Sequence, residues 1–219
     1  MNLPPPTARR YHERSRRSTY PDNPEGTMSM ALAKQAMECV WKRWGTHIPS
    51  ELREYEARDV FVFHTSEDAF LTSFSPTFEK AFQPANAWLK GMSARDCASG
   101  CAAFSTAHIT HSTRKLHISP KGMSEPEPVV LMAHEYLHWL SHEAFYPSYY
   151  KQGGNRPFQV EGITEWLTIQ CFPPGQATVV YRDEYTKTVA WVGSDKGNER
   201  RMLDFIFKGK ATNLDALHP

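Results

Sequence analysis

The chain has 219 residues, of which 40% are hydrophobic and 22% are charged, enough to bury one sizeable core. Its formal net charge of +1 lacks the basic excess typical of proteins dedicated to nucleic acids or membrane surfaces. No apolar run approaches the roughly 18 residues that span a bilayer. We therefore expect one soluble domain that acts on proteins or small molecules, with no nucleic-acid partner and no membrane insertion; the oligomeric state is open.

Residues 1–27 form the first segment, which holds five prolines, five arginines and almost no aliphatic side chains. Such a composition cannot offset the entropy of ordering, so we expect a disordered leader before a domain at residues 28–219. The leader lacks the apolar stretch of about 7–15 residues found in secretory signal peptides. It is a polar head that a syringe-type secretion system can thread, which predicts injection into a target cell; an ordinary mobile terminus of a cytoplasmic protein is the alternative.

The first half of the domain is predicted to contain one helix and three strands. Apolar residues recur at helical spacing over Met28–Trp44, and Gly45 supplies the stop. Val60–His64 is rich in β-branched and aromatic residues and predicts a buried strand, while Ala107–His111 and Lys115–Ser119 alternate weakly and predict a pair of strands. Residues 67–100 between them predict loop and short helix.

The second half of the domain is predicted to be helical. Prolines and a glycine between residues 120 and 128 break the chain before the first of these helices. The predicted helices are Val129–Phe145, Val160–Phe172, Thr178–Val192 and Asn198–Lys208. A small sheet followed by a helical C-terminal half predicts an α+β fold.

The helix Val129–Phe145 carries three ionisable residues in an apolar run, at His134, Glu135 and His138. Residues four apart lie on one helix face, so the two imidazoles can meet on one ion. Two neutral imidazoles bind Zn²⁺, and a carboxylate beside them takes a proton from the water that the metal activates. The H-E-x-x-H spacing therefore predicts a metal site with Glu135 as the catalytic base.

The other faces of this helix support that interpretation. Val130, Ala133, Leu137 and Leu140 form an apolar stripe, while the two histidines occupy an adjoining stripe. A core face and a separate ligand face suit a metal-site helix. The alternative is that the histidines are ordinary core or surface residues, because the chain is rich in histidine.

A third protein ligand is needed. The metzincin pattern requires a histidine and a glycine where this chain has Ala144 and Ser141, so it is excluded. His142 lies eight residues from His134, about 12 Å along the axis, too far for one zinc. Glu161 and Glu165 remain; they share a helix face, so one can bind the metal while the other hydrogen-bonds a ligating histidine.

The motif "HEYLH", followed by "EGITE" starting 23 positions after His138 at Glu161, resembles the gluzincin class of zinc metallopeptidases. The resemblance spans only 32 residues, His134 to Glu165. It implies a zincin-like fold and one Zn²⁺ per chain, with Glu161 as the third ligand and Glu165 as the hydrogen-bond partner of His134.

Gluzincins also use a downstream Tyr, His or Arg to stabilise the oxyanion that forms during peptide hydrolysis. On the following predicted helix, the resemblance therefore makes Tyr181, Arg182 and Tyr185 candidates, of which we favour the two tyrosines as catalytic residues. No motif selects between the tyrosines, and either can equally be a core aromatic.

The four cysteines are Cys39, Cys97, Cys101 and Cys171, whose spacing matches no familiar disulfide framework. We expect reduced thiols, because a chain of this size needs no covalent staples. A zinc site from Cys97 and Cys101 with His108 and His111 is an alternative, but both spacings miss those usual for such sites.

These observations predict a zinc-dependent endopeptidase acting on protein or peptide substrates. Its size and leader give it a looser resemblance to metalloprotease effectors and toxins that bacteria inject into other cells. A housekeeping or self-processing intracellular peptidase with the same site is one alternative. A zinc-binding interaction protein that lacks turnover is another, although Glu135 argues against it.

Overall fold

Helices make up most of the described chain, which in this computed structural model covers residues 24–73, 106–110, 113–142, 145 and 157–210. The elements in chain order are α1 (Pro24–Trp44), η2 (Ser50–Glu54), α2 (Ala57–Val60), β1 (Phe61–Phe63), β2 (Ala107–Thr110), β3 (Lys115–Ile118), α5 (Pro120–Met123), α6 (Pro128–Leu140), α8 (Pro157–Ile169), α9 (Arg182–Ser194) and α10 (Asn198–Lys208). Residues 67–73 are also helical. This mixed arrangement is compatible with the predicted α+β class.

The three described strands form one sheet in the order β1-β3-β2. β1 runs parallel to β3, and β2 pairs with β3 antiparallel, with His108 opposite His117. Leu116 and Ile118 of β3 are fully buried, so one face of the sheet lies on the core, while the alternate residue His117 faces the other side. The predicted strand pair is confirmed. The first strand starts one residue later than predicted, because Val60 closes α2.

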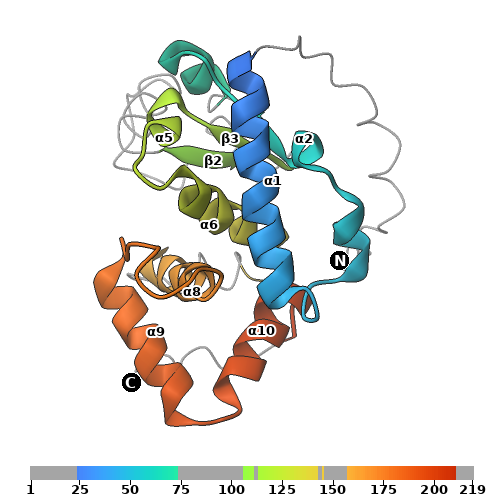
Figure 1. The fold of residues 1–219 in the computed structure, drawn as a ribbon. Helices are drawn as coiled ribbons and strands as arrows, with labels where there is room; N and C mark the ends of the chain where they lie inside the picture. The colour runs from blue at the N-terminus through green and yellow to red at the C-terminus, as the bar shows by residue number, and fades with distance from the viewer. Residues whose placement is uncertain (1–23, 74–105, 111–112, 143–144, 146–156, 211–219) are drawn as a thin grey trace, which may run out of the picture.

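Helix α1 crosses in front of the sheet and α6 (Figure 1). The indole Nε1 of Trp41 donates to the hydroxyl of Tyr136 on α6 at 2.9 Å, and that of Trp44 donates to the carbonyl of Leu167 on α8 at 3.1 Å. These two hydrogen bonds, one partly buried and one buried, tie α1 to the two helices that carry the predicted site. The predicted helix is confirmed, but it begins at Pro24, a favourable first position, and not at Met28 as predicted. Residues 1–23 lie outside the described part.

The predicted helix Val129–Phe145 is too long at its C-terminal end. α6 stops at Leu140, because Ser141 is extended (ψ 139°) and the amide of His142 donates to the carbonyl of Ile206 on α10 at 2.6 Å. The amide of His142 therefore bonds to α10 and does not extend the hydrogen-bond pattern of α6.

The remaining predicted helices differ from the structure mainly at their ends. α8 starts at Pro157 and ends at Ile169, and α9 starts at Arg182 instead of Thr178. The predicted helix Asn198–Lys208 matches α10 at both ends. Gly209, in the left-handed conformation (φ 63°), terminates α10, where the glycine caps the helix without a Cβ clash.

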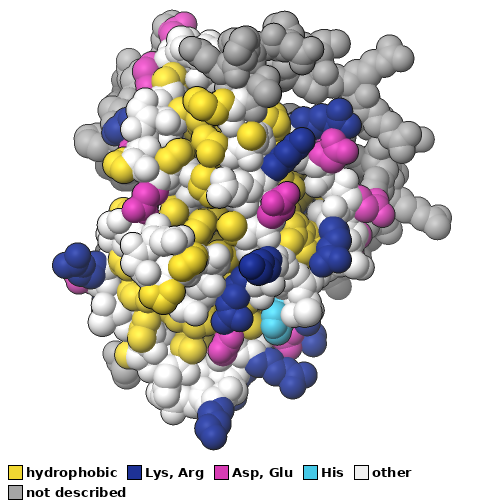
Figure 2. All heavy atoms as spheres, in the orientation of Figure 1, with side chains coloured by type: hydrophobic (Ala, Val, Ile, Leu, Met, Phe, Trp, Pro, Cys, Tyr) yellow, Lys and Arg dark blue, Asp and Glu magenta, His cyan; other side chains and the backbone are white. Residues whose placement is uncertain are grey.

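The face of the molecule on which α1 lies shows apolar side chains interspersed with Lys, Arg, Asp and Glu (Figure 2). Within the described residues, none of the helices combines the length and apolar character needed to cross a membrane. Among the described residues, three large apolar side chains are exposed: Met28, Val180 and Val189.

Candidate metal centre

Helix α6 presents both predicted histidines toward α8. His134 and His138 are each only 7% exposed, and their ring centroids lie 4.8 Å apart, one turn along the helix. On the predicted apolar stripe, Ala133, Leu137 and Leu140 are buried in the hydrophobic core. The helix therefore separates a core face from a ligand face, as its sequence pattern predicts.

Helix α8 brings the two predicted glutamates to these histidines. Oε2 of Glu161 lies 3.1 Å from Nε2 of His134 and 3.2 Å from Nε2 of His138, and the two Nε2 atoms lie 3.1 Å apart. Within the described residues, these three side chains form the one group of His, Cys, Asp or Glu whose ligand atoms converge, all within 4.8 Å. They are able to bind a metal ion.

The spacing and the donor chemistry fit such an ion. Ligand atoms around a tetrahedral zinc, at bond lengths of about 2.0–2.1 Å, lie about 3.3 Å apart. Nδ1 of His134 faces Oε2 of Glu165 at 3.1 Å; a carboxylate only accepts, so Nδ1 carries a proton, and Nε2 is the atom of this ring that would bind a metal. Two imidazole nitrogens and one carboxylate oxygen suit zinc or ferrous iron better than magnesium or calcium.

The electrostatics of the cluster favour one added positive charge. Burial alone would lower the pKa of His134, but hydrogen bonds to Glu161 and Glu165 raise it to about 10. Burial alone would raise the pKa of Glu161, but the two imidazoles hold it well below its usual range. A proton on His134 or a metal cation satisfies the same requirement.

Glu165 lies behind the histidines, at 4% exposure, as predicted for the partner of His134. Its Oε2 accepts from His134 Nδ1, and its Oε1 accepts from the backbone amide of Val180 at 2.6 Å. Thr164 Oγ1 makes a longer contact of 3.4 Å with Nδ1 of His138. α8 therefore supplies both a converging carboxylate and the groups that orient the imidazoles.

Glu135 is half-buried and stands outside the three converging ligand atoms. Burial raises the pKa of its carboxyl group, although the neighbouring imidazoles of His138 and His134 act in the opposite direction. A carboxylate that is close to the site without ligating is free to exchange protons.

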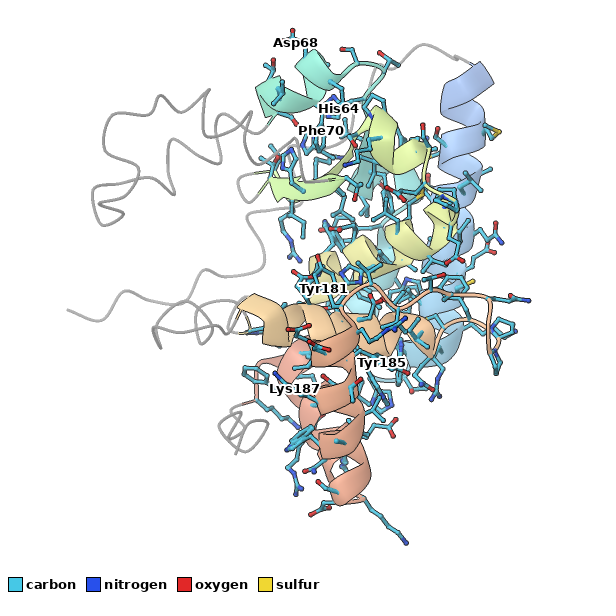
Figure 3. All side chains as sticks on the ribbon, turned by 90° about the vertical axis from the view of Figure 1, so that its left-hand side faces the viewer. His64, Asp68, Phe70, Tyr181, Tyr185 and Lys187 are labelled. Atoms are coloured by element: carbon cyan, nitrogen blue, oxygen red, sulfur yellow. The ribbon has the colours of Figure 1, made fainter. Side chains whose placement is uncertain are left out.

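The two candidate tyrosines lie in different surroundings. The ring of Tyr181, at the N-cap of α9, stacks on the imidazole of His134 with centroids 6.0 Å apart. Tyr185, one turn further along α9, packs against the hydrophobic core, and Arg182 is exposed. Figure 3 shows Tyr181 at the junction of α8, α9 and α6, with Tyr185 further down α9.

The segment before α9 is tied to both site helices. Glu127, which precedes α6, accepts from the amide and the hydroxyl of Thr178 at 3.0 and 3.1 Å, and Glu165 holds Val180. Gly162 of α8 allows α9 to approach closely, because a Cβ there would lie 2.5–2.6 Å from Glu184. We call residues 178–181 the strap; its last residue is the tyrosine on His134.

Two other histidine predictions have different outcomes. His142 is exposed and lies after the end of α6, against Gly209, in keeping with its exclusion as a ligand. For the alternative zinc site, Cys97, Cys101 and His111 lie outside the described residues. The described cysteines Cys39 and Cys171 are free thiols.

His108 takes part in a separate layer of stacked histidines on the outer face of the sheet. The rings of His108 and His117 stack at 4.7 Å, and those of His117 and His64 at 5.1 Å, with a 2.9 Å contact between His64 Nε2 and His117 Nδ1. The buried Phe70 contacts His64 and His108, and Ser73 Oγ lies 2.7 Å from His108 Nε2. Figure 3 shows His64 and Phe70 at the end of the molecule away from α9.

Sequence reasoning did not anticipate this layer, the contact of Glu165 with Val180, or Thr164. The alternation of His117 with two apolar residues in β3 is a local signal for the layer, whereas the other contacts depend on tertiary placement. Comparison with protein-family models, with curated proteins and with solved structures finds no match to this chain.

Proposed function

We propose that the chain is a zinc-dependent endopeptidase with a zincin-like fold, which hydrolyses peptide bonds of protein substrates. The observation that carries the proposal is the convergence of His134 Nε2, His138 Nε2 and Glu161 Oε2 beside Glu135, a carboxylate that does not belong to the converging set. Metal ligands plus an adjacent non-ligating base are the requirements of hydrolysis by this chemistry.

Each residue of the candidate metal centre has a separate proposed role. His134, His138 and Glu161 would hold the ion through the three converging atoms, and Glu165 would keep the His134 ring oriented. Zinc bound there would supply Lewis acidity, which brings the pKa of a water to about 7 and polarises a carbonyl. The carboxylate of Glu135 would accept a proton from the attacking water and pass it to the leaving amine, and burial raises the pKa of this carboxyl group.

Tyr181 is the better placed of the two tyrosines to stabilise the oxyanion. Burial raises the pKa of Tyr181, and the carboxylates of Glu161 and Glu135 raise it further, so its hydroxyl stays a hydrogen-bond donor across the physiological range. Its stacking on His134 places it beside the proposed reaction centre, whereas the packing of Tyr185 against the core favours a structural role.

Glu135 favours an enzyme over a zinc-binding interaction protein, because a structural metal site has no need of a half-buried, non-ligating carboxylate beside it. Injection into a target cell stays a prediction from the composition of the leader, and a housekeeping peptidase remains the alternative. Both use the same proposed site.

Cleavage of a denatured protein substrate tests the proposal. The purified chain is expected to cleave it, to stop when a zinc chelator is added, and to recover when zinc is returned in excess. The His138→Ala variant is expected to remain inactive at every zinc concentration that restores the wild type. Chelator-resistant cleavage, or no cleavage by a zinc-loaded chain, contradicts the proposal.

A further inference from the structure

An open groove of about 500 Å³ lies where the turn after α1 meets α10. Two segments far apart in the sequence line it: Thr46 and His47 of that turn, and residues between 196 and 210 in and beside α10. Lys and Arg side chains, with a few acidic ones among them, gather over this junction (Figures 1 and 2). None of the residues that line the groove belongs to the candidate metal centre.

The groove is positively charged. Four Lys or Arg side chains and two carboxylates line it, which gives a net charge of +2 with His47 neutral. The four cationic residues are Lys196, Arg200, Lys208 and Lys210, and the two acidic ones are Glu199 and Asp204. Because the whole chain has a net charge of only +1, the groove carries more positive charge than the protein as a whole.

The ion pairs inside the groove leave part of this charge uncompensated. Nζ of Lys208 lies 2.8 Å from Oδ1 of Asp204, and Nζ of Lys210 lies 3.5 Å from Oδ2 of the same carboxylate. Two ammonium groups share one carboxylate, so one positive charge remains at this end of α10. Lys196 and Arg200 are exposed, so they too can contact a ligand.

The cationic residues extend along the whole of α10. Arg200, Asp204 and Lys208 are spaced four residues apart and follow one face of the helix, while Lys196 and Lys210 lie just beyond its two ends. The helix has 11 residues and is about 16 Å long. An extended peptide covers that length with about five residues, and its alternate side chains point to the same side. A single small anion contacts only part of it.

We propose that this groove binds an acidic, extended segment of a partner protein. Carboxylates at alternate positions of the segment match the groove in sign of charge and in length, and a concave surface lined by one sign of charge attracts the opposite sign. Exposed charge pairs are individually weak and are screened by salt, so the affinity falls as the ionic strength rises. Since no metal ligand takes part, this binding is independent of the proposed function.

Fluorescence anisotropy of a labelled peptide that alternates glutamate with serine tests the proposal. The full chain is expected to bind this peptide equally with and without a zinc chelator, and to bind the same peptide with glutamine in place of glutamate about tenfold more weakly or less. Lys196→Glu combined with Arg200→Glu is expected to weaken binding of the acidic peptide about tenfold, because two attractive contacts become repulsive.

Lys34→Glu combined with Lys187→Glu is the matched control, since it makes the same change in net charge at exposed positions of α1 and α9 outside the groove. It is expected to keep the wild-type affinity, and both double variants should keep the wild-type urea midpoint. An equal loss of affinity in the two double variants overturns the groove as the binding site. A wild type that does not bind the acidic peptide, or binds the glutamine peptide as tightly, overturns the proposal, and tighter binding of single-stranded oligothymidylate overturns the assignment to a protein partner.

Discussion

Glu165 connects His134 to the strap: one carboxylate oxygen lies 3.1 Å from His134 Nδ1, and the other accepts from the amide of Val180 at 2.6 Å. A single buried side chain thus orients a proposed metal ligand and holds the segment that places Tyr181 on the same ring. Loss of this carboxylate is expected to affect metal affinity and the geometry around the metal together.

Replacing Glu165 by Ala is expected to weaken zinc affinity roughly 10–100-fold, because the His134 ring loses the group that fixes its orientation. Competition with a chromophoric chelator measures the change. Glu54→Ala, which removes an exposed glutamate from η2, is the control and should leave affinity unchanged. Unaltered affinity in the Glu165→Ala variant would mean that Glu165 does not support the site.

Replacing Glu135 by Gln is expected to reduce cleavage by about 10²-fold or more while leaving zinc bound, because the proton acceptor is removed and the three ligands are kept. Activity and metal content are measured on the same sample. A variant that loses its zinc would show Glu135 to be a ligand, and a fully active one would show that it is not the base.

Replacing Gly162 by Ala is expected to destabilise the fold by about 1–3 kcal/mol, because the new Cβ would overlap the backbone of Glu184 and push α9 away from α8. Urea unfolding measures the loss. Gly193→Ala is the matched control, since a Cβ there meets nothing within 4 Å and alanine favours the helix. Equal stability of the two variants would contradict the close packing of α9 on α8.

The histidine layer predicts a loss of stability in acid. Burial, followed by the neighbouring imidazoles, lowers the pKa of His108 to about 3 and of His117 to about 4, and burial lowers that of His64. An unfolded histidine titrates near 6.5. Between these values the unfolded chain binds protons that the folded chain does not, so this stability is complete above about pH 6.5 and falls as the pH drops toward 4.

Urea midpoints measured from pH 7 to pH 4.5 check this expectation. His117→Gln removes the central imidazole and should flatten the decline relative to wild type. Lys115, which also opposes protonation of His117, is retained in both proteins. The same pH dependence in wild type and variant would show that the layer does not control acid stability.

The parts of the structure that sequence predicted best depend on local periodicity. The spacing of four residues predicted that His134 and His138 share one helix face, and likewise Glu161 and Glu165. The order of strands and helices along the chain predicted the α+β class. Helix ends were less predictable where tertiary contacts decide them: α6 stops because the amide after Ser141 bonds to Ile206, far along the chain. The strap was predicted as the start of a helix, because no local signal reveals that Glu127 and Glu165 hold its backbone.

The metal content of the purified chain tests the central claim most directly. Protein prepared without chelators, analysed by elemental analysis and by native mass spectrometry, is expected to carry one zinc per chain, and both His134→Ala and His138→Ala should carry almost none. Stoichiometric iron in place of zinc would point to oxidative chemistry, because two histidines and a carboxylate are also a ligand set of ferrous enzymes. No bound metal, or zinc retained after loss of both histidines, would contradict the account.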